Sequence, residues 1–367
     1  MRKTQLMVIM LAMLLSVAGL SRAEISIDQL VEQSRMREGD IAVRDLPRWR
    51  GAHKILVWDI GLDLSELVES APDVEFIVVE SAADAMQYAG DVDAMIGFCT
   101  SELIAAAEKL VWVQIYWAGA ESCLSVNDVA DGTVMMSNMQ KMSSPVIAEH
   151  AIAMMMALSR NLPRFVGLMR DGEWSDGGAA TDGMMPIAGK SLLVVGLGGI
   201  GMEVARMGAA LGMRVSGTRN SSRNGPDYIE YVGLSNELAE LAASADVIVN
   251  ALPLTDTTLN LLDAEFFSTV KAGAIFINIG RGKTVVTGDL LAALESGRIS
   301  GAGLDVTAPE PLPASSPMWQ RDDVIITPHV AGSGGERERH TVLLRENVRR
   351  YIAGEPLLNV VNPQKGY

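Results

Sequence analysis

The sequence has little positive charge and few of the side chains that bind metal ions. Its 367 residues include 30 lysines and arginines against 45 aspartates and glutamates, a formal net charge of −15. Such a chain does not attract phosphate backbones and has no basic stripe, so we expect no nucleic-acid binding. The two cysteines, Cys99 and Cys123, form no CxxC pair and no cysteine–histidine spacing that suits zinc, so we expect no metal site. Export would permit a disulfide, but buried thiols are commoner in apolar surroundings, and we do not predict a bridge.

One apolar run stands apart at the amino terminus. Arg2 and Lys3 precede the run 6–20, which is short for a membrane span, and Ser21-Arg22-Ala23 follow it. This pattern is typical of an export signal cut after Ala23. An uncleaved membrane anchor or a wrongly assigned start codon remains an alternative. Residues 24–50 carry no pattern that we can interpret.

The rest of the chain predicts an α/β protein with two doubly wound parallel sheets. Short apolar or β-branched runs alternate with helix-like stretches, which indicates parallel strands joined by helices. The first series of expected strands is 55–58, 75–79, 94–98, 111–115 and 134–137. The second series is 191–195, 213–217, 247–250, 274–279, 303–306 and 324–327. A helix predicted over 146–159, with Pro145 near its first turn, lies between the two series.

A glycine loop opens the second series. Gly196, Gly198, Gly199, Ile200 and Gly201 belong to a GxGxxG motif that follows the run 191–195 and precedes a helix-like segment. In this context the glycines permit a tight turn and a close approach of backbone amides to a pyrophosphate. The motif therefore predicts a dinucleotide site.

The end of the next expected strand bears on the choice of cofactor. No carboxylate suited to the ribose hydroxyls occurs before Asp227, whereas Arg219, Ser221 and Arg223 lie where a 2′-phosphate would bind. We therefore expect NADP(H) to be preferred, with NAD(H) possible. The alternative is that the two arginines are solvated surface residues.

Three polar residues follow strand ends of the second series. His329 is the only one of the four histidines placed directly after an expected strand, and Arg281 and Glu310 follow two others. Open α/β sheets bind ligands at such ends. A cation, a proton donor and a carboxylate that orients the donor suit a 2-oxo acid. His150 and His340 lie on expected helices and are expected to be structural or solvated.

Five segments together resemble the D-isomer-specific 2-hydroxyacid dehydrogenases. They are 276–282 (FINIGRG), 303–312 (GLDVTAPEPL), 327–329 (TPH), 148–150 (AEH) and 114–120 (QIYWAGA). The resemblance implies that His329 is the acid/base, that Glu310 is its partner and that Arg281 binds the substrate carboxylate and carbonyl. It also implies that Asp305 holds the nicotinamide carboxamide. The other residues implied at the cofactor are Leu252, Pro253, Ile279 and Gly280, and the loop implied at the substrate carboxylate is Trp117, Ala118, Gly119 and Ala120.

The resemblance also implies a domain order and a partner. A Rossmann NAD(P)-binding domain (144–330) is expected to be inserted into a flavodoxin-like substrate domain (24–143 and 331–367), after the signal or anchor (1–23). A homodimer is expected through the nucleotide-binding domain, and membrane contact only through an uncleaved amino terminus. The chain lacks an appended regulatory domain, which argues against phosphoglycerate dehydrogenases and favours small substrates such as glyoxylate and hydroxypyruvate.

Two questions stay open at this stage. Export would place the protein in the periplasm, whereas its cofactor is found in the cytoplasm, and a tethered enzyme is a third option. The runner-up function is a non-catalytic NAD(P)-sensing binding protein on the same scaffold. Turnover on a panel of 2-oxo acids distinguishes it from an oxidoreductase.

Overall fold

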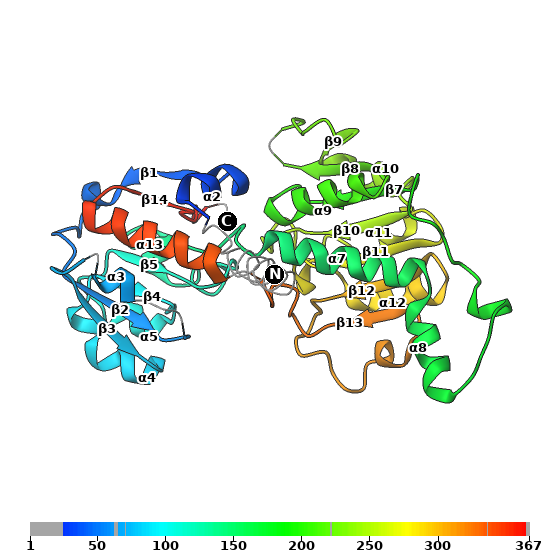
Figure 1. Cartoon of the computed structure of the whole chain (residues 1–367), viewed down its shortest axis with the longest axis horizontal. Helices are drawn as coiled ribbons and strands as arrows, with labels where there is room; N and C mark the ends of the chain where they lie inside the picture. The colour runs from blue at the N-terminus through cyan, green and yellow to red at the C-terminus, as the bar shows by residue number, and fades with distance from the viewer. Residues whose placement is uncertain (1–24, 62–64, 70, 221, 336, 365–367) are drawn as a thin grey trace, which may run out of the picture.

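The computed structural model describes residues 25–61, 65–69, 71–220, 222–335 and 337–364, which form two lobes (Figure 1). Each lobe is built around one parallel sheet with helices on its faces. The signal-like segment 1–23 lies outside the described residues. None of the helices in the described ranges combines the length and apolar character needed to cross a bilayer.

The first lobe, on the left of Figure 1, holds a sheet of five strands in the order β3-β2-β4-β5-β6. This is the flavodoxin-like order, and every neighbouring pair is parallel. The strands match the first predicted series to within about two residues at each end. Their bounds are β2 (Lys54–Trp58), β3 (Glu75–Val79), β4 (Ala94–Ile96), β5 (Trp112–Gln114) and β6 (Met135–Ser137). The helices between them are α3 (Ser65–Glu69), α4 (Ala82–Ala85), α5 (Ser101–Ala105) and α6 (Asn127–Ala130).

Segments from both ends of the described chain complete the first lobe. The segment that resisted interpretation forms α2 (Ile27–Ser34), closed by a capping box between Ser26 and Gln29, and β1 (Glu38–Ala42). β1 pairs antiparallel with β14 (Pro356–Leu358). The helix that directly precedes β14 is α13 (Arg337–Ala353), and it packs against the five-stranded sheet. The Tyr351 ring packs 4.9 Å from that of Trp112, centroid to centroid, inside this core.

The second lobe holds seven parallel strands in the order β13-β12-β11-β10-β7-β8-β9. The order reverses between β7 and β10, as in a Rossmann fold, so the α/β prediction of two doubly wound sheets is confirmed. The bounds are β7 (Ser191–Val195), β8 (Arg214–Arg219), β9 (Tyr231–Leu234), β10 (Val247–Asn250), β11 (Ala274–Asn278), β12 (Ile299–Leu304) and β13 (Val324–Ile326). The connecting helices are α9 (Gly199–Ala210), α10 (Leu238–Ala242), α11 (Ala264–Thr269) and α12 (Thr287–Glu295). The sequence did not predict β9, a short edge strand that pairs with β8 alone.

The predicted joining helix is α7 (Ser144–Ser159), which begins two residues earlier than expected with Pro145 in its first turn. Its buried side chains, such as Met155, share a core with Leu192 of β7. A second helix, α8 (Leu162–Asp171), follows it and projects at the lower right of Figure 1.

The expectation for the cysteines is wrong. Cys99 follows β4 and Cys123 follows β5, and the two form a disulfide with Cα atoms 5.4 Å apart. The strands are neighbours in the sheet, which brings the loops at their carboxyl ends together. Strand order, which sequence spacing does not contain, decides whether two distant cysteines meet.

Candidate active site

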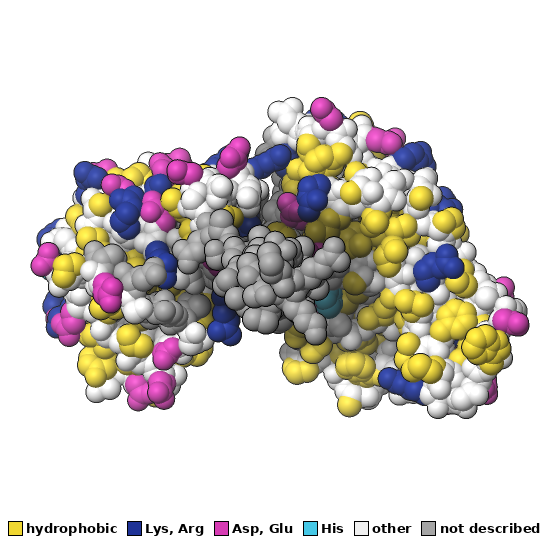
Figure 2. Space-filling view, in the orientation of Figure 1, with side chains coloured by type: hydrophobic (Ala, Val, Ile, Leu, Met, Phe, Trp, Pro, Cys, Tyr) yellow, Lys and Arg dark blue, Asp and Glu magenta, His cyan; other side chains and the backbone are white. Residues whose placement is uncertain are grey.

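A cleft of about 2720 Å³ runs between the two lobes along the carboxyl ends of both sheets. Figure 2 shows the furrow between the lobes at the top of the view. The glycine loop, Arg281, Asp305 and His329 line it from the second lobe, and the loop with Trp117 lines it from the first. Most of the residues predicted from distant parts of the chain therefore meet in one place.

The glycine loop forms a cradle that a side chain would fill. Gly196 has φ 96°, which favours glycine, and a Cβ on Gly201 would overlap the Gly196 carbonyl oxygen. Gly198 has open space beside it, and α9 begins at the next residue. Backbone amides are thus accessible at a helix amino terminus, which fits the pyrophosphate of a dinucleotide. Farther along the same wall lie Ile200, Leu252, Pro253, Ile279 and Gly280.

His329 and Glu310 form a hydrogen-bonded pair. The Nδ1 atom of His329 lies 3.1 Å from Oε2 of Glu310, and both side chains are half-exposed. Glu310 is itself held by the Thr307 amide, which donates to Oε1 at 2.9 Å. With Nδ1 engaged, Nε2 of the ring is the nitrogen available to a ligand in the cleft.

Hydrogen bonds with Asp305 fix the backbone conformation at His329. Its φ is 56°, a left-handed conformation unusual for a residue with a side chain, and its amide donates to the Asp305 carbonyl oxygen at 2.8 Å. The buried Asp305 carboxylate accepts from the Thr327 hydroxyl at 2.7 Å and the Val330 amide at 2.9 Å. Asp305 therefore anchors the loop that carries His329, in addition to lining the cleft where the carboxamide was expected.

His150 is part of this support. Its Nε2 lies 2.9 Å from the Thr327 hydroxyl and 3.8 Å from Oδ1 of Asp305. The sequence assigned it a structural or solvated place on its helix and gave no sign that the helix and the end of β13 meet. His340 approaches the Ser143 hydroxyl at 3.3 Å and also lines the cleft.

The loop Trp117–Ala120 reaches across the cleft to Arg281. A Cβ on Gly119 would come within 2.5 Å of Nη2 of Arg281, so the guanidinium lies directly against this backbone. The next acidic residue, Glu121, accepts from Nε of Arg281 at 2.8 Å and forms an ion pair between the lobes. The sequence analysis did not single out Glu121. Its position directly after a loop that is expected to bind the substrate carboxylate could have indicated that it competes for the same arginine.

The expected 2′-phosphate residues do not all face the cleft. Arg219 lines it, and its guanidinium donates to the Leu197 carbonyl oxygen at 3.0 and 3.1 Å and to that of Asn224 at 3.0 Å. Arg223 is absent from the lining residues described and pairs instead with Glu237 at 2.7 Å. Hydrogen bonds from Arg223, the Leu234 amide and Tyr231 lower the pKa of Glu237 to about 2.

Glu237, 14 residues further along the chain, therefore holds Arg223 in this structure, and a part for Arg223 at a 2′-phosphate stays a prediction. Ser221 lies outside the described residues. Within the described ranges, no group of three His, Cys, Asp or Glu side chains is placed to hold a metal ion.

Comparison with known proteins places the chain in a family. A model described as D-isomer specific 2-hydroxyacid dehydrogenase, NAD binding domain, matches residues 152–331. The glyoxylate reductase of Pyrococcus furiosus is 30% identical over 286 residues, 75% of this chain and 83% of that protein. The glyoxylate reductase of Korarchaeum cryptofilum is 29% identical over 341 residues, 90% of this chain and 97% of that protein.

A solved structure agrees with these relatives. The D-isomer specific 2-hydroxyacid dehydrogenase from Xanthobacter autotrophicus, in complex with NADPH and MES, is 30% identical with a TM-score of 0.71, covering 86% of this chain and 99% of that chain. The match spans only 59% of an uncharacterised Corynebacterium melassecola protein and 54% of the D-3-phosphoglycerate dehydrogenase of Methanocaldococcus jannaschii. The chain belongs to the D-isomer-specific 2-hydroxyacid dehydrogenase family, a class of NAD(P)-dependent oxidoreductases.

Proposed function

We propose that this protein reduces small 2-oxo acids of the glyoxylate and hydroxypyruvate kind to D-2-hydroxy acids, with His329 as the acid. The observation that carries the proposal is that His329, which pairs with Glu310, lines the same cleft as Arg281 and the glycine loop. The similar glyoxylate reductases support the choice of substrate class.

The proposed reaction uses the side chains of His329, Glu310 and Arg281. The nicotinamide, when bound, supplies the hydride to C2 of the substrate. His329, as imidazolium, gives the Nε2 proton to the developing alkoxide, while Glu310 holds the ring through Nδ1. Arg281 binds the substrate carboxylate and stabilises the negative charge on the carbonyl oxygen.

Binding of the substrate requires an exchange of partners at Arg281. Glu121 now occupies Nε of that guanidinium, so the incoming carboxylate competes with it. The backbone of the loop at Gly119 lies against the same guanidinium, so a carboxylate bound to Arg281 would also lie beside this loop. The ion pair thus favours substrates whose carboxylate binds Arg281 better than a half-exposed glutamate does.

NADP(H) is the cofactor that we propose to be preferred. Arg219 lies at the end of β8, on the cleft wall, where a 2′-phosphate is expected. The similar protein from Xanthobacter autotrophicus binds NADPH. Equal catalytic efficiency with NADH and NADPH would contradict this preference.

The experiment that tests the function is an initial-rate survey of the purified protein. NADPH or NADH is mixed with glyoxylate, hydroxypyruvate, pyruvate and longer 2-oxo acids, and the chirality of each chiral product is determined. We expect the highest kcat/KM with the smallest substrates, and D products only. Tight cofactor binding without turnover on any substrate would instead indicate a binding protein.

A homodimer through the nucleotide-binding lobe is part of the proposal. Exposed apolar side chains gather on α7, on α8 and just beyond, and they are Met156, Leu162, Val166, Met169 and Trp174. Contiguous apolar surface of this kind is costly in water and is typical of subunit contacts. Light scattering should give twice the chain mass, and Met169→Lys should shift it toward the monomer; a monomer at micromolar concentration would contradict the dimer.

For residues 1–23 we propose an export signal. Fractionation of cells that express the full chain, followed by sequencing of its amino terminus, is the test. A periplasmic chain that begins at Glu24 is expected, whereas an intact chain in the cytoplasm or at the membrane would contradict export.

A further inference from the structure

The wall of the cleft opposite the glycine loop carries positive side chains from the first lobe. Arg35 follows α2, Arg37 precedes β1 and Lys141 precedes α7, and all three line the cleft. Lys141 bridges these segments, because its Nζ donates to the Arg35 carbonyl oxygen at 2.6 Å. Figure 1 shows α2 on the side of the first lobe that faces α9.

Two residues of this wall approach the amino terminus of α9. A Cβ built on Gly199 would lie 2.8 Å from Cγ of Lys141 and 2.9 Å from Oγ of Ser144. Both side chains therefore lie beside the backbone amides to which the pyrophosphate of a dinucleotide would bind. The glycine loop has a polar wall directly across from it.

The Ser144 hydroxyl is an unpaired group in this wall. The residue is only 4% exposed, and its Oγ has no hydrogen-bond partner among the described residues. Leaving a buried hydroxyl unpaired costs about 1–3 kcal/mol, so buried polar groups normally have a partner. A phosphate oxygen placed between Ser144 and the glycine loop would satisfy it.

The three cations of the wall share the cleft with the carboxylates of Glu38, Asp40 and Glu203. Within the described ranges no carboxylate forms an ion pair with Arg35, Arg37 or Lys141, and the nearby Glu38 pairs with Arg350 at 2.7 Å. Burial, together with the charges of Arg37 and Arg35, lowers the pKa of Lys141. An anion bound here would relieve the repulsion between the three cations.

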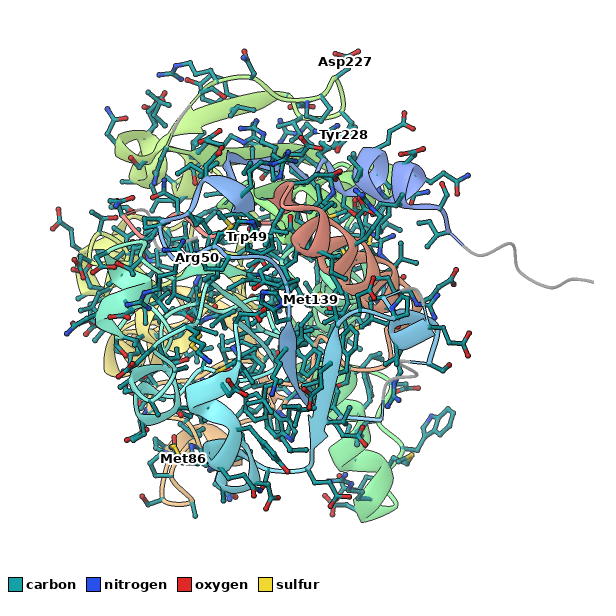
Figure 3. All side chains as sticks on the ribbon, turned by 90° about the vertical axis from the view of Figure 1, so that its left-hand side faces the viewer. Trp49, Arg50, Met86, Met139, Asp227 and Tyr228 are labelled. Carbon is teal, nitrogen blue, oxygen red and sulfur yellow. A yellow bond between two sulfur atoms is a disulfide. The ribbon has the colours of Figure 1, made fainter. Side chains whose placement is uncertain are left out.

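A tyrosine of the second lobe, Tyr228, lines the same cleft as Arg35. Burial raises the pKa of Tyr228, and the positive charge of Arg35 opposes this shift. Tyr228 precedes β9, and Figure 3 shows it near the top of the view. The cations of the first lobe and this tyrosine therefore line one ligand-binding space.

We propose that Arg35, Arg37, Lys141 and Ser144 form the second half of the cofactor's phosphate site and bind phosphate oxygens across the cleft from the glycine loop. The inference rests on the proposed function and adds to it a part for the amino-terminal segment. Since one anion would contact both lobes, bound cofactor also holds them together.

Equilibrium titration of the full-length protein with NADPH and NADH, followed by fluorescence, tests the proposal. The double variant Arg35→Ala/Arg37→Ala should raise the Kd for NADPH about a hundredfold, because it removes two charge-assisted hydrogen bonds and each is worth about tenfold in affinity. The salt dependence of binding should weaken as well. Arg35→Lys/Arg37→Lys, which keeps the charges, should recover most of the affinity.

The two cofactors separate the phosphates. An equal loss of NADH and NADPH affinity assigns the cluster to the pyrophosphate, and a loss confined to NADPH assigns it to the 2′-phosphate. Ser144→Ala should raise the Kd about threefold, as expected for one hydrogen bond. In both variants KM for the cofactor should rise while kcat at saturating cofactor stays unchanged.

Arg214→Ala is the matched control, since it removes an exposed arginine from the start of β8, outside the cleft lining and outside the proposed dimer contact. Wild-type affinity and wild-type salt dependence in the Arg35/Arg37 double variant would overturn the proposal. That result differs from failure of the proposed function, in which the wild-type protein itself would bind cofactor without turnover or not bind it at all.

Discussion

The two sheets share a feature at the amino ends of their strands. In the first lobe Asp93, just before β4, accepts from the amides of His53 and Lys54 at 2.9 and 2.8 Å. In the second lobe Asp246, just before β10, accepts from the Ser191 amide at 2.9 Å. In both sheets an aspartate thus joins the starts of the two strands between which the strand order reverses.

The sheets differ at their carboxyl ends. In the second lobe the loop with His329 is held by hydrogen bonds to Asp305 and the glycine loop is closely packed. In the first lobe the cleft is lined by a loop whose main tie to the other side is the single ion pair of Glu121 with Arg281. In the proposed function the second lobe therefore carries the acid/base histidine, and the first supplies charges that bind the ligands.

The largest effect on activity is expected at His329, on the side of the cleft that the second lobe forms. His329→Ala should lower kcat by about 10²–10⁴-fold, the usual contribution of a general acid, with little change in the Kd for NADPH. Steady-state kinetics and a fluorescence titration measure the two quantities. His53→Ala, at an exposed histidine of the first lobe outside the cleft lining, is the control and should be fully active.

The shared aspartates allow a test of stability. Burial opposes ionisation of Asp246, but hydrogen bonds from Lys271 and Ser191 outweigh it and lower its pKa to about 2. A carboxyl with a lowered pKa stabilises the fold above the unfolded pKa of about 4, and this contribution is lost as the pH falls toward 2. Asp246→Asn should cost about 1–2 kcal/mol at pH 7, less than the full shift implies because solvent screens the Lys271 pair.

Thermal melting from pH 7 to pH 2 measures this effect. The difference in Tm between the wild type and Asp246→Asn should be constant down to about pH 5 and shrink below about pH 4. A difference that persists unchanged at pH 2 would show that the charge of Asp246 is not its source.

A smaller effect, an improvement in activity and not a loss, is expected at Glu121, on the side of the cleft that the first lobe forms. Glu121→Gln removes the competitor for Arg281, so KM for the 2-oxo acid should fall about two- to fivefold, the range of a partly exposed ion pair, with kcat retained. Glu102→Gln, at an exposed position of α5, is the control. A fall in kcat with unchanged KM would instead make Glu121 a residue that positions Arg281.

The smallest effect is expected at Arg223. Because Glu237 and the Tyr231 hydroxyl hold it, Arg223→Ala should leave the ratio of NADPH to NADH efficiency within about twofold of the wild type. A loss of catalytic efficiency with NADPH alone would instead show that Arg223 binds the 2′-phosphate.

The sequence predicted whatever depends on local pattern. The run 191–195 followed by glycines predicted β7, the loop and α9, and the residues after strand ends predicted where His329 and Arg281 lie. What it missed depends on contacts between distant segments. The pairing of β1 with β14, the meeting of Cys99 with Cys123 and the capture of Arg281 by Glu121 follow from the assembled fold, which no spacing in the chain records.

The central claim is that one cleft both binds the cofactor and reduces a 2-oxo acid. The most direct test is the stoichiometry of a reaction that contains only the purified wild-type protein, NADPH and glyoxylate. We predict one glycolate formed for each NADPH oxidised, over many turnovers. NADPH that binds but stays reduced with glyoxylate and every other 2-oxo acid tested would contradict the account.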